Sequence, residues 1–231
     1  MTRGQAVSST LVPSPDESQL VDTSQFASIA DALEAVHPRS VYNDLAPHYF
    51  SNVPEEPGIP QLVLQAMLAR MNGLHQGIHR ELANDNPFGV WPLMRAFFEL
   101  EVAMLYVSKY PALITAFATR HSETSGGDIS LPSMQKMLNK IRDAIPTGRE
   151  AYRQFCDMAH TGALATWSAF NVTSHDLDGT LTLEWSSQPR FRDGQALIAA
   201  AQLKQLSEST IFLFKELASQ ILGGPPTPIE G

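Results

Sequence analysis

The chain of 231 residues has a single cysteine, few basic residues and no long uninterrupted apolar run. Because Cys156 has no second cysteine to pair with, an intrachain disulfide is excluded, and we expect a reducing compartment. No stretch approaches the roughly 20 charge-free apolar residues that span a bilayer, so no membrane-spanning segment is predicted. The first residues lack the apolar core, about 7–15 residues long, of a secretory signal. These absences predict a cytoplasmic protein without membrane association.

Basic side chains are outnumbered, with 16 Lys and Arg against 24 Asp and Glu and a formal net charge of −8. Non-specific binding of duplex DNA needs a basic face, so such binding is not expected. The chain contains neither a P-loop nor a G-x-S-x-G nucleophile elbow, and we expect no cofactor. Apolar material is plentiful, because 43% of the residues are hydrophobic, which is enough to form a core.

Helical periodicity dominates the sequence between residues 25 and 222 and predicts an antiparallel multi-helix bundle of the all-α class. Residues 60–83 and 87–108 have the strongest patterns, and the Asn84-Asp85-Asn86 segment between them predicts a turn. Asn86 is expected to cap the second of these helices, with Pro87 at its first position. Further helices are predicted at about 25–37, 131–145, 147–162 and 193–222.

Three other segments break the helical pattern. Residues 38–59 carry four prolines and are predicted to cross the bundle without regular structure. Alternation in 180–185, preceded by the turn sequence Leu-Asp-Gly-Thr, predicts a small β-hairpin at about 172–185, inserted before the last helix. Residues 1–24 are predicted to be a disordered tail and residues 223–231 a flexible one, which leaves a single domain over 25–222.

The helix at 87–108 is apolar nearly all round and is therefore predicted to be buried on most sides. It nevertheless carries Arg95 and Glu99, which lie four residues apart and so on one stripe of the helix. Charged side chains are rarely buried unless they are paired. The pair is either an internal ion pair that ties helices together or part of a functional site, where it would orient His160 or hold a substrate anion. The pattern alone leaves both interpretations open.

A second candidate site is the segment Arg153–Asp157–His160, predicted to lie on one helix. Seven residues span about two helical turns, so Arg153 and His160 share a face with Asp157 between them. A histidine beside a permanent cation suits phosphodiester cleavage, because the imidazole can move protons while the guanidinium stabilises the phosphate. The alternative is a surface ion pair between Arg153 and Asp157, followed by a histidine that stabilises the end of the helix.

The spacing of His75 and His79 is that of two metal ligands on a helix. No further ligand motif accompanies them, and His75 falls within the Leu and Met stripe of its helix. We therefore predict a hydrogen-bonded core histidine beside a surface histidine, and no metal site.

Two motifs and the order of the helices resemble the HEPN superfamily of α-helical bundles over roughly residues 60–220. Ribonuclease members of that superfamily carry an Arg followed, after a short spacer, by a His, as Arg153 and His160 are here. The chain also resembles a group of uncharacterised bacterial all-helical proteins related to that superfamily. Their helix with Arg and Glu four residues apart corresponds to Arg95 and Glu99, and their later Tyr and His to Tyr152 and His160.

The resemblance implies a metal-independent endoribonuclease in bacterial defence or a toxin–antitoxin system. His160 would then transfer protons, Arg153 would be the cation beside the phosphate, and a homodimer would pair two such sets. The residues that would support this catalytic pair are Arg95, Glu99, Asp157 and Tyr152. The second function that it allows is a non-catalytic HEPN-like scaffold, or a binding module for a partner protein or a nucleotide.

Overall fold

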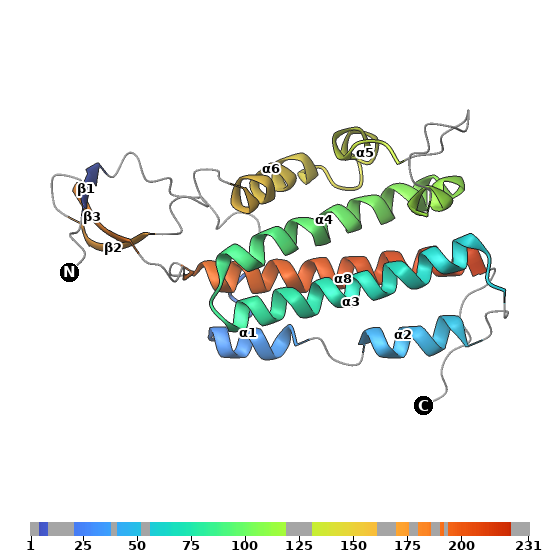
Figure 1. Cartoon of the computed structure of the whole chain (residues 1–231), viewed down its shortest axis with the longest axis horizontal. Coiled ribbons are helices and arrows are strands. Elements are labelled where there is room, and N and C mark those ends of the chain that lie inside the picture. Colours follow the sequence, from blue (N-terminus) through green and yellow to red (C-terminus); the bar gives the residue numbers. More distant parts are fainter. Residues whose placement is uncertain are drawn as a thin grey trace. The chain divides into compact units, whose positions relative to one another are not determined.

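The computed structural model describes residues 5–8, 21–37, 41–51, 56–118, 131–160, 170–175, 180–185, 190–191 and 194–222. These residues form a helical protein with one small sheet (Figure 1). The chain divides into two compact units. The first comprises Met1–His37, Gly77–Arg95 and Glu150–Lys204, and the second comprises Pro38–Gln76, Ala96–Arg149 and Gln205–Gly231. The division does not follow a linker, because three long helices contribute residues to both units. The single domain over 25–222 stays a prediction.

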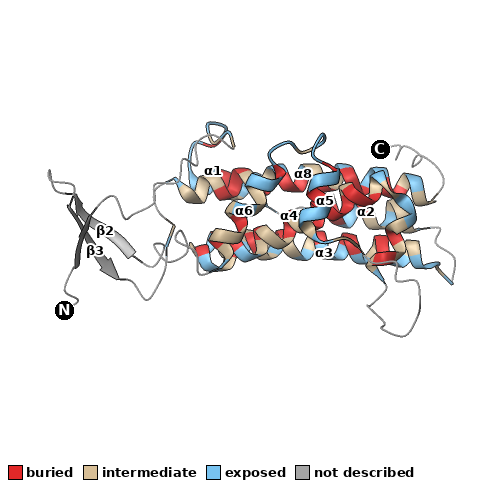
Figure 2. Cartoon of the chain, turned by 90° about the horizontal axis from the view of Figure 1, so that it is seen from above, coloured by how far each residue is buried: buried red, intermediate tan, exposed pale blue. Residues whose placement is uncertain are grey.

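The three long helices are α3 (Ile59–Ala83), α4 (Pro87–Lys109) and α8 (Gln195–Leu222). All three lie in segments that the sequence predicts to be helical, and the helical class of the fold is confirmed. Buried residues, red in Figure 2, recur along all three helices among exposed ones, as an amphipathic pattern requires. None of the helices described in the structure is long and apolar enough to cross a membrane.

The first unit also contains α1 (Ile29–Ala35), α6 (Gly148–Ala159) and a three-stranded antiparallel sheet. Strands β2 (Phe170–His175) and β3 (Thr180–Trp185) are paired, and Phe170 lies opposite Trp185. The register shifts between Val172 and Ser174. These strands fall in the segment for which the sequence predicts a hairpin, and the predicted turn at Asp178 and Gly179 lies outside the described residues.

The third strand corrects the prediction for the N-terminal segment. Residues 1–24 are predicted to be disordered, yet β1 (Gln5–Ser8) pairs with β3, with Gln5 opposite Leu183. A strand at the edge of a hairpin offers unpaired N–H and C=O groups to any extended segment. Backbone pairing of this kind needs no side-chain alternation, and four residues are too few to reveal one. The predicted flexible tail at 223–231 lies outside the described residues.

The second unit adds α2 (Val41–Phe50), the 3₁₀ helix η3 (Pro111–Phe117) and α5 (Met134–Lys140). The prediction of an irregular crossing at 38–59 was therefore wrong for α2, which contains Pro47 within the helix. Tyr42 and Leu45 are buried, and the Tyr49 ring packs edge-on against Phe214 of α8 at 5.6 Å. Packing of these side chains outweighs the backbone hydrogen bond that the proline removes.

The turn between α3 and α4 matches its sequence. The Asn86 side chain accepts a hydrogen bond from the Gly89 backbone N–H at 3.3 Å, so the predicted cap of α4 is confirmed. Asp85 adopts a positive φ of 55°, a conformation that Asp tolerates better than most residues. Its carboxylate accepts the Phe191 N–H at 3.0 Å, which ties the turn to the segment before α8.

Candidate functional site

Helix α4 is buried on most sides, as its sequence predicts. Its buried residues face in every direction around the axis and include Val90, Met94, Phe97, Val102 and Met104. Arg95 and Glu99 are both half-buried, whereas Glu101 is buried. The helix therefore holds Arg95 in place with apolar neighbours and leaves its guanidinium partly open to solvent.

Helix α6 supplies the other side of the site. Phe155 and Met158 are buried and anchor the helix, while Arg153 is exposed and Tyr152 and Asp157 are half-buried. His160 directly follows the last helical residue, and its N–H donates to the Cys156 carbonyl at 3.1 Å. That hydrogen bond continues the helical pattern by one residue and holds the exposed His160 at the C-terminal end of α6.

Arg95 meets two of these side chains within the first unit. One guanidinium nitrogen contacts Nε2 of His160, and the other donates to the Tyr152 hydroxyl at 3.3 Å. The Arg95 Cζ lies 5.6 Å from the centroid of the Tyr152 ring, within the range of a cation–π interaction. The structure thus brings together Arg95, Tyr152 and His160, three of the six site residues that the sequence singles out. We call these three residues the Arg95 cluster.

The contact with Arg95 fixes the chemical form of His160. A guanidinium has N–H donors and no acceptor, so Nε2 of His160 must accept the hydrogen bond. In this hydrogen bond Nε2 carries no hydrogen, and a general base that acts through Nε2 requires the same arrangement.

Arg153 has a different environment from the one that the sequence suggests. Its guanidinium pairs with Glu150, one turn earlier on α6, at 2.6 Å, and its side chain is 77% exposed. Among the described residues Arg153 forms this ion pair and none with Asp157, so the predicted surface pair was wrong in its partner. A spacing of three residues on a helix serves an ion pair as well as a spacing of four. No hydrogen bond in the described part of the chain joins Arg153 to His160.

Two predicted site residues, Glu99 and Asp157, are half-buried carboxylates. Glu99 belongs to the second unit, where it lines a groove. Its ion pair with Arg95 stays a prediction, as does the supporting role of Asp157. The clue that pointed to Arg95 was a permanent charge on an apolar helix. A role for Arg95 in orienting His160 was one of the predicted alternatives, but spacing could not establish the contact, because 65 residues separate the two.

His75 is buried, and the prediction of a hydrogen-bonded core histidine is confirmed. Its Nδ1 lies 2.9 Å from the Tyr42 hydroxyl and 2.9 Å from the Ser207 hydroxyl. His79 is half-buried, and its Nε2 lies 3.2 Å from the Leu33 carbonyl. Desolvation lowers the pKa of His79. Within the described ranges, no group of three or more His, Cys, Asp or Glu side chains is arranged to hold a metal ion.

Comparison with known proteins adds nothing to this description, because no protein-family model, curated protein or solved structure matches the chain. The case for function therefore depends on the geometry of the site.

Proposed function

We propose that the Arg95 cluster is the active site of a metal-independent endoribonuclease. The observation that carries this proposal is the contact between the Arg95 guanidinium and Nε2 of His160. In this contact a permanent cation lies beside an imidazole nitrogen, and His160 is exposed. Cleavage of RNA by its own 2′-hydroxyl needs these two functions, a proton acceptor and a group that stabilises charge on the phosphate.

In the proposed reaction, His160 removes the proton from a ribose 2′-hydroxyl, and the 2′ oxygen attacks the adjacent phosphorus. The bond from phosphorus to the 5′ oxygen breaks. That oxygen leaves with a proton from solvent, or from a protonated His160 of a second copy of the chain in a homodimer. The products are a 2′,3′-cyclic phosphate and a 5′-hydroxyl end, so no oxidant or water molecule is consumed. Arg95 binds a non-bridging phosphate oxygen and stabilises its growing charge.

Binding of a phosphate would also release the base. The Arg95 N–H that now points at Nε2 would turn to the charged oxygen, because hydrogen bonds to an ionised acceptor are stronger than those to a neutral one. Nε2 would then be available for the 2′-hydroxyl. Tyr152 is a positioning residue in this scheme, since its hydroxyl accepts a second N–H of the same guanidinium. Arg153 remains an alternative cation, which would have to leave Glu150 to reach the phosphate.

A non-catalytic scaffold or binding module is the second candidate. It is favoured by the same contact, because Nε2 of His160 already accepts a hydrogen bond, and by the net charge of −8, which opposes RNA binding. In that case the Arg95 cluster joins α4 to α6 and has no substrate. The two functions differ in whether His160 is needed for RNA cleavage.

The test is cleavage of a defined single-stranded RNA by the purified chain in EDTA, with His160→Ala beside it. His37→Ala is the matched control, because His37 is also an exposed histidine. We expect the wild type and the control to produce cyclic phosphate ends, and His160→Ala to be slower by about 100-fold or more. Cleavage by none of the three would support the scaffold. Equal cleavage by all three would exclude His160 as the base.

A further inference from the structure

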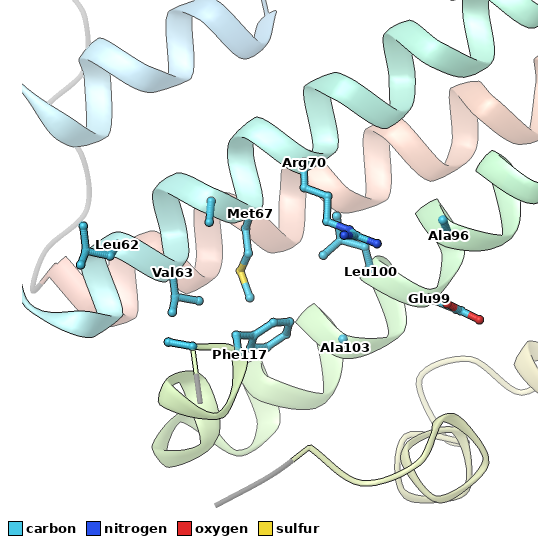
Figure 3. Close-up of a pocket in the computed structure, with 11 residues that line it drawn as sticks. Leu62, Val63, Met67, Arg70, Ala96, Glu99, Leu100, Ala103 and Phe117 are labelled. Atoms are coloured by element: carbon cyan, nitrogen blue, oxygen red, sulfur yellow. The ribbon is translucent and has the colours of Figure 1, made fainter. Parts of the chain in front are cut away.

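A groove in the second unit lies between α3 and α4 and reaches the end of η3 (Figure 3). Its volume is about 510 Å³, within the usual range of small-molecule sites. Most of its lining is apolar, and only two lining side chains carry a charge. The lining residues are Leu62, Val63, Ala66, Met67, Arg70, Ala96, Glu99, Leu100, Ala103, Phe117 and Ala118.

Small side chains leave this space open. Ala66 on α3, Ala96 and Ala103 on α4, and Ala118 after η3 all line the groove. Longer side chains at these positions would fill the seam between the helices, as close packing normally requires. Leu62, Ala66, Arg70 and Ala118 are exposed, so the groove is open to solvent and a ligand can enter it.

The two charged residues stand at one end of the groove. In Figure 3 the Arg70 guanidinium reaches from α3 toward Leu100 on α4, while the Glu99 carboxylate points away from it. Leu62 lies at the other end, and Phe117 lies between the two ends, near Met67. Leu62 and Arg70 are eight residues apart on one helix, which corresponds to about 12 Å along the groove. The site therefore combines an apolar channel with a cation at its mouth.

We propose that this groove binds a medium-chain fatty acid. The alkyl chain would lie against Met67, Leu100 and Phe117, and the carboxylate would pair with Arg70. A guanidinium matches a carboxylate with two parallel hydrogen bonds, and an apolar wall favours an alkyl chain over a polar metabolite. All lining residues of the groove belong to the second unit, whereas the Arg95 cluster belongs to the first, and the proposal uses no residue of that cluster.

The test is calorimetric titration of the full chain with decanoate and, separately, with decyltrimethylammonium, each below its micellar concentration. The two probes share an alkyl chain and differ in the sign of the head group. We expect saturable binding of one decanoate per chain and at least about tenfold weaker binding of the cation. Arg70→Gln should remove this preference while leaving some binding of both probes.

Filling the groove separates a specific site from general surface adsorption. Ala66→Leu should weaken decanoate binding by about tenfold or more, because the new side chain occupies the channel. Ala69→Leu is the matched control, since Ala69 is exposed on the same helix and does not line the groove. All variants would first be checked by circular dichroism and thermal melting. No saturable binding of decanoate, or equal affinity in the two leucine variants, would overturn the proposal.

Discussion

Individual polar side chains of this protein fall into two groups with different surroundings. Arg95, Tyr152 and His160 retain contact with solvent and contact one another. Tyr42, His75, Ser207 and Glu101 are buried and have hydrogen-bond partners inside the second unit. The first group is available to a ligand, whereas the second serves the packing of the helices and makes the stability of the fold depend on pH.

Tyr42 should make the protein sensitive to alkali. Burial raises the pKa of Tyr42 from 10.0 to about 12. In the unfolded chain the phenol loses its proton near pH 10, while the folded chain keeps it until about pH 12, so stability falls with rising pH across this window. We expect Tyr42→Phe to cost about 1 kcal/mol at pH 7 through the lost hydrogen bond to His75.

In the same variant, the free energy of unfolding should fall less between pH 10 and 12 than in the wild type, by about 2 kcal/mol. Urea unfolding at pH 7, 10 and 11.5 measures both effects. An unchanged alkaline slope in Tyr42→Phe would show that the phenol is not protected by the fold.

Glu101, like Tyr42, should make the stability of the fold fall with rising pH, but in the acid range. Desolvation raises the pKa of this carboxyl, and the hydrogen bond from Ser209 lowers it by less. The folded state therefore keeps the proton at a pH where the unfolded chain has lost it. The stabilising contribution of the protonated carboxyl is complete below about pH 4.5 and is lost as pH rises through the pKa of the folded state.

Glu101→Gln removes this titration, so its stability relative to the wild type should rise as pH increases from 4 to 7. Chemical denaturation across that range tests the change, with Glu208→Gln as the control, because Glu208 is exposed on α8. A relative stability that stays constant for Glu101→Gln would contradict the raised pKa.

The helices illustrate what periodicity can and cannot predict. The repeats in α3 and α4 and the Asn86 cap were sufficient for their bounds, because local spacing encodes them. Helix α2 was missed because the four prolines of segment 38–59 pointed to irregular structure, while the helix packs against Phe214, far away in sequence. Strand β1 was missed because it depends on the free edge of β3. Elements whose formation requires a distant partner were the ones that local patterns did not predict.

Two phenylalanines on α8 test which of its faces packs. Phe214 is fully buried and touches the rings of Tyr49 and Phe50, whereas Phe212 is 63% exposed. Phe214→Ala should lower the free energy of unfolding by about 3–5 kcal/mol, because it removes apolar burial and leaves a cavity. Phe212→Ala should change it by less than about 0.5 kcal/mol. Thermal or urea unfolding of both variants gives the comparison, and equal effects would mean that α8 is rotated from its position in the structure.

For the molecule as a whole, the sequence predicted the helical class and identified the residues of the Arg95 cluster, but not their arrangement. Spacing along one helix favoured Arg153 as the partner of His160, since only neighbours on the same helix can be inferred from spacing. The structure instead brings in Arg95 from α4. The sequence did not predict the groove beside Arg70, because alanines on separate elements form it together.

The proposed ribonuclease also predicts an assembly. The resemblance to HEPN ribonucleases implies a homodimer that pairs two sets of catalytic residues. Light scattering coupled to size-exclusion chromatography should therefore give twice the mass of the 25.3 kDa chain at micromolar concentration. A mass that corresponds to one chain, in a preparation that cleaves RNA, would show that a single Arg95 cluster is sufficient.

The most direct test of the central claim compares two arginines. Arg95→Gln and Arg153→Gln each remove one guanidinium, and cleavage of the same RNA in EDTA measures which one the reaction needs. If Arg95 is the phosphate-side cation, Arg95→Gln should be slower by about 100-fold or more, and Arg153→Gln should stay within about threefold of the wild type. Full activity in Arg95→Gln, or a large loss confined to Arg153→Gln, would contradict the assignment of the active site to the Arg95 cluster.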